Sequence, residues 1–226
     1  MKTVVVGGHS RNIGKTSVMA GLIRSLKSLN WTAVKITQYG HGICSHDGEP
    51  CGCAPTDHAF VLTEERDVAG HSDTCRFLSA GAQRALWLRV REGQLAEGFP
   101  LLEQAWGQDE WVMIESNSVL NLMKPSLYLV VLDSSQGDFK PSALNFLDRA
   151  DALILIGTCL DNFAGAWPMV RPGIIENKPK FPLAPGYYSS PTLCRFVRQK
   201  LLGPGENNPV ESTGHPVQGK EKMCQH

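Results

Sequence analysis

The feature that most constrains this chain is its N-terminal run VVVGGHSRNIGKTS, which begins at Val4 and ends at Ser17. A short β-branched run, a glycine-bearing turn and a Gly-Lys-Thr that opens an amphipathic segment follow one another in the order typical of a phosphate-binding loop. In such a loop, backbone N–H groups point inward and the positive N-terminus of the next helix faces the same anion. The sequence therefore predicts a strand, a phosphate-binding loop and a helix, in that order.

The loop predicts a site for a nucleoside triphosphate, either GTP or ATP, together with Mg²⁺. Lys15 would supply a mobile charge for the outer phosphates, and the Thr16 hydroxyl suits a phosphate-bound Mg²⁺. The phosphates are expected to lie against Ser10, Arg11, Asn12, Ile13, Gly14, Lys15, Thr16 and Ser17. His9 stands where the usual spacing has a glycine, so the loop is either one residue longer than usual or has a non-glycine first corner. The alternative is an ordinary turn in which Lys15 is merely exposed.

The composition is typical of a soluble globular protein and argues against several classes of partner. With 22 Lys and Arg against 22 Asp and Glu, the formal net charge is zero, which argues against broad binding to nucleic acid. No apolar run is long enough to span a bilayer, and residues 1–10 are expected to form a strand rather than an export signal. We therefore expect a cytoplasmic protein that binds neither membrane nor nucleic acid and whose 7 cysteines are reduced or bound to metal.

Alternating apolar segments predict a three-layer α/β fold over residues 1–202, in which helices flank a mostly parallel, twisted sheet. Strands are expected at 3–6, 31–37, 84–90, 109–117, 127–133 and 150–157, with a short one about 173–175. Helices are expected at 15–28, 94–106 and 191–202, with another starting near Ser72, and 60–65 is either a strand or a helix. Residues 203–226 have no apolar periodicity, so we expect a disordered tail.

Two carboxylates are candidates for the metal side of the site. Glu115 ends the apolar strand WVMIE, and ligands of open α/β sheets lie beyond the carboxyl ends of strands. We expect Thr16 and Glu115 to hold Mg²⁺, and Lys15, Asp73 and Glu115 to be the catalytic residues. Asp73 follows Ser72, a good N-cap, so its carboxylate either suits the helix dipole or lies near the loop and polarises water or supports the metal.

Three further charged residues have more than one interpretation. Asp133 closes the strand LYLVVLD as Glu115 closes its own, but a carboxylate that caps the next turn is the simpler interpretation. Lys35 lies inside a strand, where it is either an exposed edge lysine or faces the site. Hydrolysis should be slow, because no side chain is an obvious transition-state arginine except Arg11, inside the loop.

Residues 38–58 form a long loop that contains three cysteines and three histidines. Loops of this length in compact domains usually have a function or are held by something. Cys44, Cys51, Cys53 and His58 could form a four-coordinate Zn²⁺ site, because thiolate and imidazole suit that ion. The spacing matches no standard zinc motif, so a flexible, redox-sensitive flap is the alternative.

Several pieces of the chain resemble the family of molybdopterin-guanine dinucleotide biosynthesis adapter protein B. They are the phosphate-binding loop, the run SDTCR at 72–76 that leads to AGA at 80–82 and a strand, Glu115 after the next strand, and NKP at 177–179 before the final helix. The resemblance implies a nucleotide-dependent adapter in molybdenum cofactor biosynthesis, with a protein partner and a homodimeric state.

A second resemblance covers the run IESN at 114–117 and the strands that follow, which are similar to nickel-insertion GTPases of urease and hydrogenase maturation. Both families belong to the SIMIBI class of P-loop proteins, typified by dethiobiotin synthetase and MinD-type ATPases. This leaves two alternatives to the adapter: a metal-handling NTPase, and an ATP-dependent kinase or ligase. GTPases read guanine with Asn-Lys-x-Asp, but residues 157–162 are GTCLDN, so the sequence does not choose between ATP and GTP.

Overall fold

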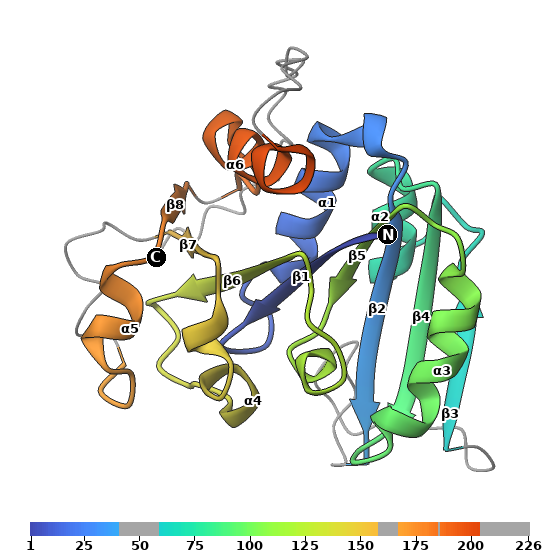
Figure 1. The fold of residues 1–226 in the computed structure, drawn as a ribbon, viewed down its shortest axis with the longest axis horizontal. Helices are drawn as coiled ribbons and strands as arrows, with labels where there is room; N and C mark the ends of the chain where they lie inside the picture. Colours follow the sequence, from blue (N-terminus) through green and yellow to red (C-terminus); the bar gives the residue numbers. More distant parts are fainter. Residues whose placement is uncertain (41–58, 158–166, 185, 204–226) are drawn as a thin grey trace, which may run out of the picture.

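The computed structural model describes residues 1–40, 59–157, 167–184 and 186–203. They form an eight-stranded sheet in the order β3-β4-β2-β5-β1-β6-β7-β8 (Figure 1). Neighbouring strands are parallel except β3 and β4, which are antiparallel. The strands are β1 (Lys2–Gly8), β2 (Thr32–Tyr39), β3 (Phe60–Glu64), β4 (Arg84–Arg91), β5 (Trp111–Glu115), β6 (Leu127–Asp133), β7 (Ala152–Ile156) and β8 (Lys180–Leu183).

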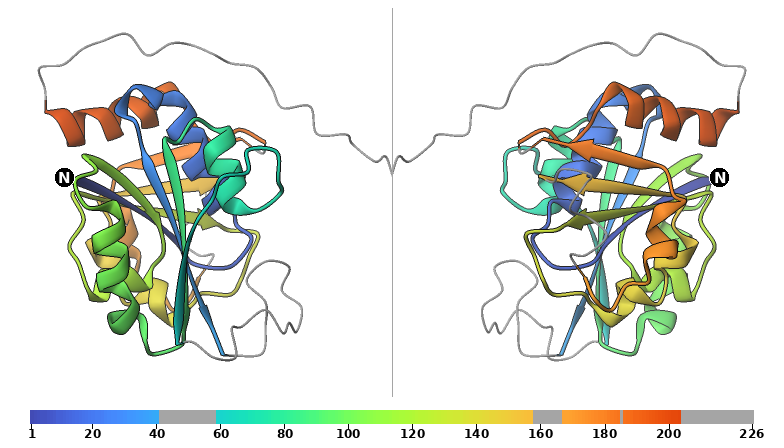
Figure 2. Two further views of the ribbon diagram at one scale, coloured as in Figure 1. Left: turned by 90° about the vertical axis from the view of Figure 1, so that its right-hand side faces the viewer. Right: turned by 90° about the vertical axis from the view of Figure 1, so that its left-hand side faces the viewer.

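Helices cover both faces of this sheet and enclose two apolar cores. On one face lie α1 (Lys15–Ser25), α2 (Asp73–Ser79) and α6 (Pro191–Leu202), and on the other lie α3 (Leu95–Trp106), α4 (Pro141–Leu144) and α5 (Pro172–Glu176). Figure 2 shows α2 and α3 on opposite sides of β2 and β4. Successive strand residues face opposite cores: Val4 and Val6 contribute to the first core and Val5 to the second. The predicted three-layer, mostly parallel α/β fold is therefore confirmed.

The amphipathic patterns of the two longest predicted helices are confirmed. In α1, Val18, Leu22 and Ile23 are fully buried, although the helix ends at Ser25 and a 3-10 turn at Lys27–Leu29 completes the predicted stretch. In α3, the predicted apolar side is buried as expected, at Leu95, Phe99, Leu102 and Trp106. None of the helices in the described part of the chain has both the length and the apolarity that a membrane crossing requires.

The structure corrects the prediction in the C-terminal third of the described chain. The strand predicted about 173–175 is wrong, because these residues belong to the helix α5, which has a proline in its first turn. The strand in this region is β8, a parallel edge strand that contains Pro182. A proline is tolerated there because an edge strand can leave one N–H position unpaired. Residues 60–65, for which the sequence allowed a strand or a helix, contain the strand β3. The strand predicted at 109–117 is shorter in the structure, where β5 covers Trp111–Glu115.

The order of strands in space differs from their order along the chain, and this difference positions the site. β5 lies between β1 and β2, and β1 lies between β5 and β6. As a result, the last residue of β5, Glu115, is in register with Val6 of β1 on one side and with Lys35 of β2 on the other. The start of the predicted loop at residues 38–58 also changes, because β2 runs to Tyr39, and residues 41–58 lie outside the described part of the chain.

Candidate functional site

The chain passes from β1 to α1 through a turn whose backbone suits an anion. Asn12 and Gly14 have left-handed backbone angles, with φ of 55° and 89°. Left-handed residues within such a turn help successive N–H groups to face one side. Gly14 is the N-cap of α1, where no side chain accepts a hydrogen bond and no acidic residue lies in the first turn. The positive N-terminus of α1 is therefore not satisfied by its own side chains, which leaves it available to an external anion.

Lys15 folds back along this turn. Its Nζ donates a hydrogen bond to the carbonyl oxygen of Ser10 at 2.5 Å, and the side chain is half-buried. A Cβ on Gly8 would lie 2.8 Å from Cδ of Lys15, so any other residue at position 8 would displace the Lys15 side chain from this path. Burial lowers the pKa of Lys15, and the negative charge of Glu115 partly offsets this effect. Lys15 is therefore half-buried against the turn rather than exposed, and its contact with phosphates stays a prediction.

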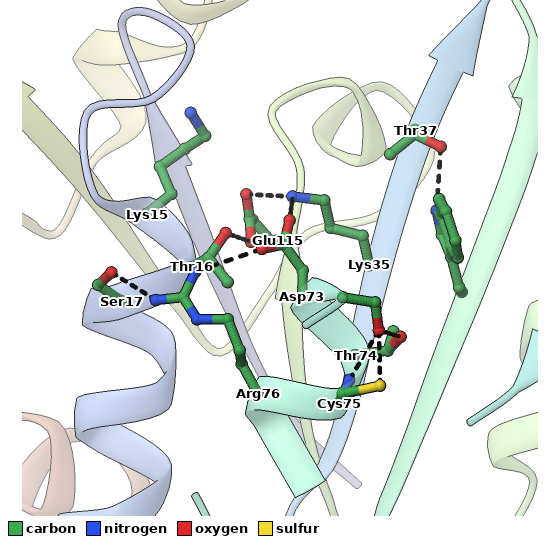
Figure 3. Close-up of polar contacts among 12 residues, drawn as sticks. Lys15, Thr16, Ser17, Lys35, Thr37, Asp73, Thr74, Cys75, Arg76 and Glu115 are labelled. Carbon is green, nitrogen blue, oxygen red and sulfur yellow. Dashed lines mark hydrogen bonds and ion pairs between the residues drawn. The ribbon is translucent and has the colours of Figure 1, made fainter. Parts of the chain in front are cut away.

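Thr16, Glu115, Lys35 and Asp73 converge beside the start of α1, as Figure 3 shows. The Thr16 hydroxyl donates to Oε2 of Glu115 at 2.7 Å. The Lys35 ammonium lies 2.7 Å from Oε1 of Glu115 and 2.7 Å from Oδ2 of Asp73. Glu115 and Lys35 share one face because they are in register on adjacent parallel strands, and Asp73 reaches them from the first turn of α2.

The charges in this cluster stabilise one another. The side chains of Lys35 and Glu115 are only 13% and 5% exposed, so water solvates neither charge well and each is stabilised by the opposite charge of the other. Burial by itself would lower the pKa of Lys35, but the charges of Glu115 and Asp73 outweigh it and raise that pKa. Burial would raise the pKa of Asp73, but Lys35 outweighs it and the pKa is lowered. Lys35 therefore faces the site, and the edge-lysine interpretation is wrong.

Side-chain hydrogen bonds stabilise the first turn of α2, the helix that carries Asp73. Ser72 is its N-cap and accepts a hydrogen bond from the Cys75 N–H at 3.0 Å. The Glu65 carboxylate accepts from the Ser72 and Thr74 hydroxyls at 3.1 and 3.0 Å. The pKa of the Glu65 carboxyl is lowered to about 2 by hydrogen bonds, and the bond from the Asp67 N–H contributes most. Asp73 therefore starts α2 and also lies beside the loop, next to Lys35, and its role toward water or a metal stays a prediction.

Arg76, one turn further along α2, joins this helix to α1. Its guanidinium donates to the Ser17 hydroxyl at 2.7 Å and lies 3.4 Å from Oδ1 of Asp73 (Figure 3). The arginine of the SDTCR run thus orients Asp73 and contacts the residue after Thr16. The sequence marked Arg76 only through the family resemblance, because the contact joins residues that are far apart in the chain.

His9 is a structural residue at the first corner of the loop. It is fully buried, and its ring lies 5.2 Å from that of Phe139 and 4.8 Å from that of Trp167, centroid to centroid. Nδ1 donates to the carbonyl oxygen of Asp138 at 2.7 Å, and Nε2 accepts from the N–H of Asp133 at 3.0 Å. Burial lowers the pKa of His9, so the ring is neutral in this arrangement. The loop therefore has a non-glycine first corner that packing holds in place.

The remaining predicted residues occupy varied positions. In the loop, Ser10 donates through its hydroxyl to the Asp138 carboxylate, Arg11 is half-buried, Asn12 is exposed and Ile13 is in the core. Asp133 accepts from the Ser135 N–H at 2.9 Å, so the turn-capping interpretation holds. Cys44, Cys51, Cys53 and His58 lie outside the described residues. Within the described ranges, no group of three or more His, Cys, Asp or Glu side chains could hold a metal ion.

Asn117 is a site residue that the sequence did not identify. Its side-chain oxygen accepts from the Gly8 N–H at 3.0 Å, and its nitrogen donates to the Gly8 carbonyl oxygen at 2.9 Å. Both bonds hold the last residue of β1, directly before the loop. The available signal was the IESN run, but a contact between residues 109 positions apart has no local pattern.

Among the solved structures that are similar to this chain are HypB and LpxK. No protein-family model matches the sequence, and a comparison with curated proteins finds no match. HypB from Helicobacter pylori, solved with nickel, is 15% identical over 87% of this chain and 86% of HypB, with a TM-score of 0.46. LpxK from Aquifex aeolicus, solved with ATP, is 16% identical over 80% of this chain, with a TM-score of 0.45, and this chain covers only 53% of LpxK. At these values, neither structure carries an argument about the site.

Proposed function

We propose that this protein binds a nucleoside triphosphate with Mg²⁺, hydrolyses it slowly, and acts in the cytoplasm as an adapter in molybdenum cofactor biosynthesis. One observation carries the nucleotide part: the Thr16 hydroxyl meets the Glu115 carboxylate at 2.7 Å, at the uncapped start of α1 and directly after Lys15. A hydroxyl, a carboxylate, a lysine and free helix N–H groups are the parts that a Mg²⁺-triphosphate requires.

The residues beside Thr16 fit Mg²⁺. Thr16, Glu115 and Asp73 offer hydroxyl and carboxylate oxygens, which are the donors that this hard cation prefers. The proposal is supported by the Lys35 ammonium, a positive charge that lies 2.7 Å from each of the two carboxylates. Thr16 and Glu115 would hold the ion, and Asp73 would support it or polarise a water molecule. When bound, Mg²⁺ neutralises charge on the phosphate oxygens.

Slow hydrolysis is supported by how the arginines near the site are used. Arg76 is committed to Ser17 and Asp73, where it orients α2 rather than facing the loop's centre. Arg11 lies in the loop and remains the arginine with access to the phosphates. Slow turnover suits an adapter whose partner completes the site. The protein partner and the homodimer that the family resemblance implies belong to the same proposal.

A nucleotide-binding panel tests the first part of the proposal. Calorimetric titrations with ATP, GTP and their diphosphates, with and without Mg²⁺, should give specific binding of a triphosphate that Mg²⁺ strengthens at least about tenfold, because the ion adds a charged contact worth roughly 1.5–3 kcal/mol. The panel also determines whether ATP or GTP is preferred. Failure of both triphosphates to bind in the presence of Mg²⁺ would contradict the proposal.

Deletion of the gene tests the adapter role separately from nucleotide binding. Cells without the protein should lose most activity of enzymes that use a guanine dinucleotide form of the molybdenum cofactor, and nickel enzymes should keep theirs. A complementing copy of the wild-type gene is the control for the deletion itself. Loss of nickel-enzyme activity alone would favour the metal-handling NTPase over the adapter.

A further inference from the structure

The segment after β6 is bonded to the start of the phosphate-binding loop at three points. The carbonyl oxygen of Asp138 accepts from Nδ1 of His9 at 2.7 Å, and the Asp138 carboxylate accepts from the Ser10 hydroxyl. The Lys140 N–H donates to the His9 carbonyl oxygen at 2.8 Å. These bonds place the backbone of Lys140 directly against the first corner of the loop.

Packing makes this placement rigid. The ring of Phe139, the residue between Asp138 and Lys140, lies against both His9 and Trp167, at 5.2 and 5.7 Å between ring centroids. Because the His9 ring is fully buried among these aromatic rings, the segment and the loop corner form one packed unit. The position of Lys140 relative to the loop is therefore set before any ligand binds.

The Lys140 side chain is half-buried and lies among positive charges. In the described part of the chain, no group accepts a hydrogen bond from its ammonium, and the nearby Asp138 carboxylate already accepts one from Ser10. Burial and then the charges of Lys15 and Arg11 lower the pKa of Lys140 to about 8, with a smaller effect of Lys35. Around Lys140, the cations Lys15, Arg11 and Lys35 outnumber the one carboxylate, Asp138, and such an excess of positive charge favours the binding of a polyanion.

We propose that Lys140 is a second phosphate-binding lysine, which contacts the terminal phosphate of the bound nucleoside triphosphate. This inference rests on the proposed function and extends it by one residue. The lysine of a phosphate-binding loop reaches the outer phosphates, whereas backbone N–H groups of the loop hold the inner ones. Since the Lys15 ammonium lies at the Ser10 carbonyl oxygen, the outer phosphate belongs at the Ser10 end of the loop. The backbone N–H of Lys140 is bonded to that same end of the loop, at the His9 carbonyl oxygen.

Replacing Lys140 by methionine tests this assignment, because the variant keeps the length of the stem and the backbone bond to His9. Titrations with diphosphates and with non-hydrolysable triphosphates in Mg²⁺ should show a triphosphate affinity lower by about 10- to 100-fold, the loss of one charge-assisted hydrogen bond. Diphosphate affinity should change less than about twofold, since the terminal phosphate is missing. K140R should recover most of the triphosphate affinity. The exposed Lys124 supplies the matched control, K124M, which should bind as wild type does.

Proton uptake gives a second readout, which a merely structural lysine would not change. At pH 8, wild-type Lys140 would take up about half a proton when a phosphate restores its full charge, measurable from binding enthalpies in buffers of different ionisation enthalpy. Uptake should fall by that amount in K140M. The other charged groups that face Lys140, namely Lys15, Arg11, Lys35 and Asp138, are present in both proteins, so the difference isolates Lys140.

The outcomes separate this inference from the proposed function. If wild type binds triphosphate but K140M binds it equally well, or loses diphosphate and triphosphate affinity by the same factor, the assignment of Lys140 is wrong and the proposed function stands. If wild type binds no triphosphate, the proposed function fails and the inference with it. Thermal unfolding of K140M and wild type identifies a loss of affinity that comes from misfolding.

Discussion

Replacing Lys15 by alanine is expected to lower the affinity for Mg²⁺-triphosphate about 100-fold while leaving the fold intact. In the proposed site the Lys15 ammonium contacts the outer phosphates, and one charge-assisted hydrogen bond is worth roughly 1.5–3 kcal/mol, or about one to two powers of ten. Stability should change by less than about 1 kcal/mol, because among the described residues the ammonium donates only to the Ser10 carbonyl oxygen, and burial disfavours its charge.

Calorimetric binding and urea unfolding of the same samples check both halves of this expectation. K124A, which removes an exposed lysine far from the loop in sequence, controls for the general effect of a lost charge. K15A with unchanged affinity would end the nucleotide proposal, since the proposed site assigns the main contact with the outer phosphates to Lys15. An unfolded K15A would mean that the lysine is structural.

Replacing Lys35 by methionine is expected to lower the free energy of unfolding by about 3 kcal/mol. The reason is that Glu115 and Asp73 lose the ammonium that lies 2.7 Å from each. Removing one partner of a buried ion pair costs roughly 3–5 kcal/mol, because the remaining charge is uncompensated. The partly exposed Asp73, at 33%, moderates the effect and places it at the lower end of this range.

Mg²⁺ should restore much of the stability of K35M and affect wild type less. In the proposed site the ammonium and the divalent cation compete for the same carboxylates, so a protein without the ammonium would gain more stability from binding the ion. Urea unfolding with and without Mg²⁺ measures this difference. The double variant K35M/E115Q should recover part of the lost stability, since it also removes the uncompensated charge.

A surface ion pair gives the matched control for the Lys35 experiment. Arg84 and Glu64 lie 2.9 Å apart but are 29% and 37% exposed, so E64Q, which leaves the bonds of Arg84 to Asp109 and Ala105 in place, should cost less than about 1 kcal/mol and gain nothing from Mg²⁺. If K35M is as stable as wild type and indifferent to Mg²⁺, the carboxylates are not a cation site. The magnesium part of the proposed function would then be wrong, while phosphate binding by the loop could still hold.

The sequence by itself determined the elements whose signals are local. The order of strand, loop and helix at the N-terminus follows from the β-branched run and Gly-Lys-Thr, and the buried sides of α1 and α3 follow from their periodicity. Local signals failed at the far edge of the sheet. Pro182 is atypical of a strand, so the sequence does not predict β8, and the apolar residues of α5 resemble those of a strand. Short elements carry too few residues for periodicity to separate the two structures.

The tertiary structure alone decided which side chains meet at the end of β1. Lys35 and Glu115 are 80 positions apart, and the sequence left Lys35 with two interpretations. The choice depended on β5 lying between β1 and β2, and on a register that puts Lys35 and Glu115 in one row. Side chains in one row of adjacent parallel strands share a face, but strand order and register arise from packing of the whole sheet, which no single segment encodes.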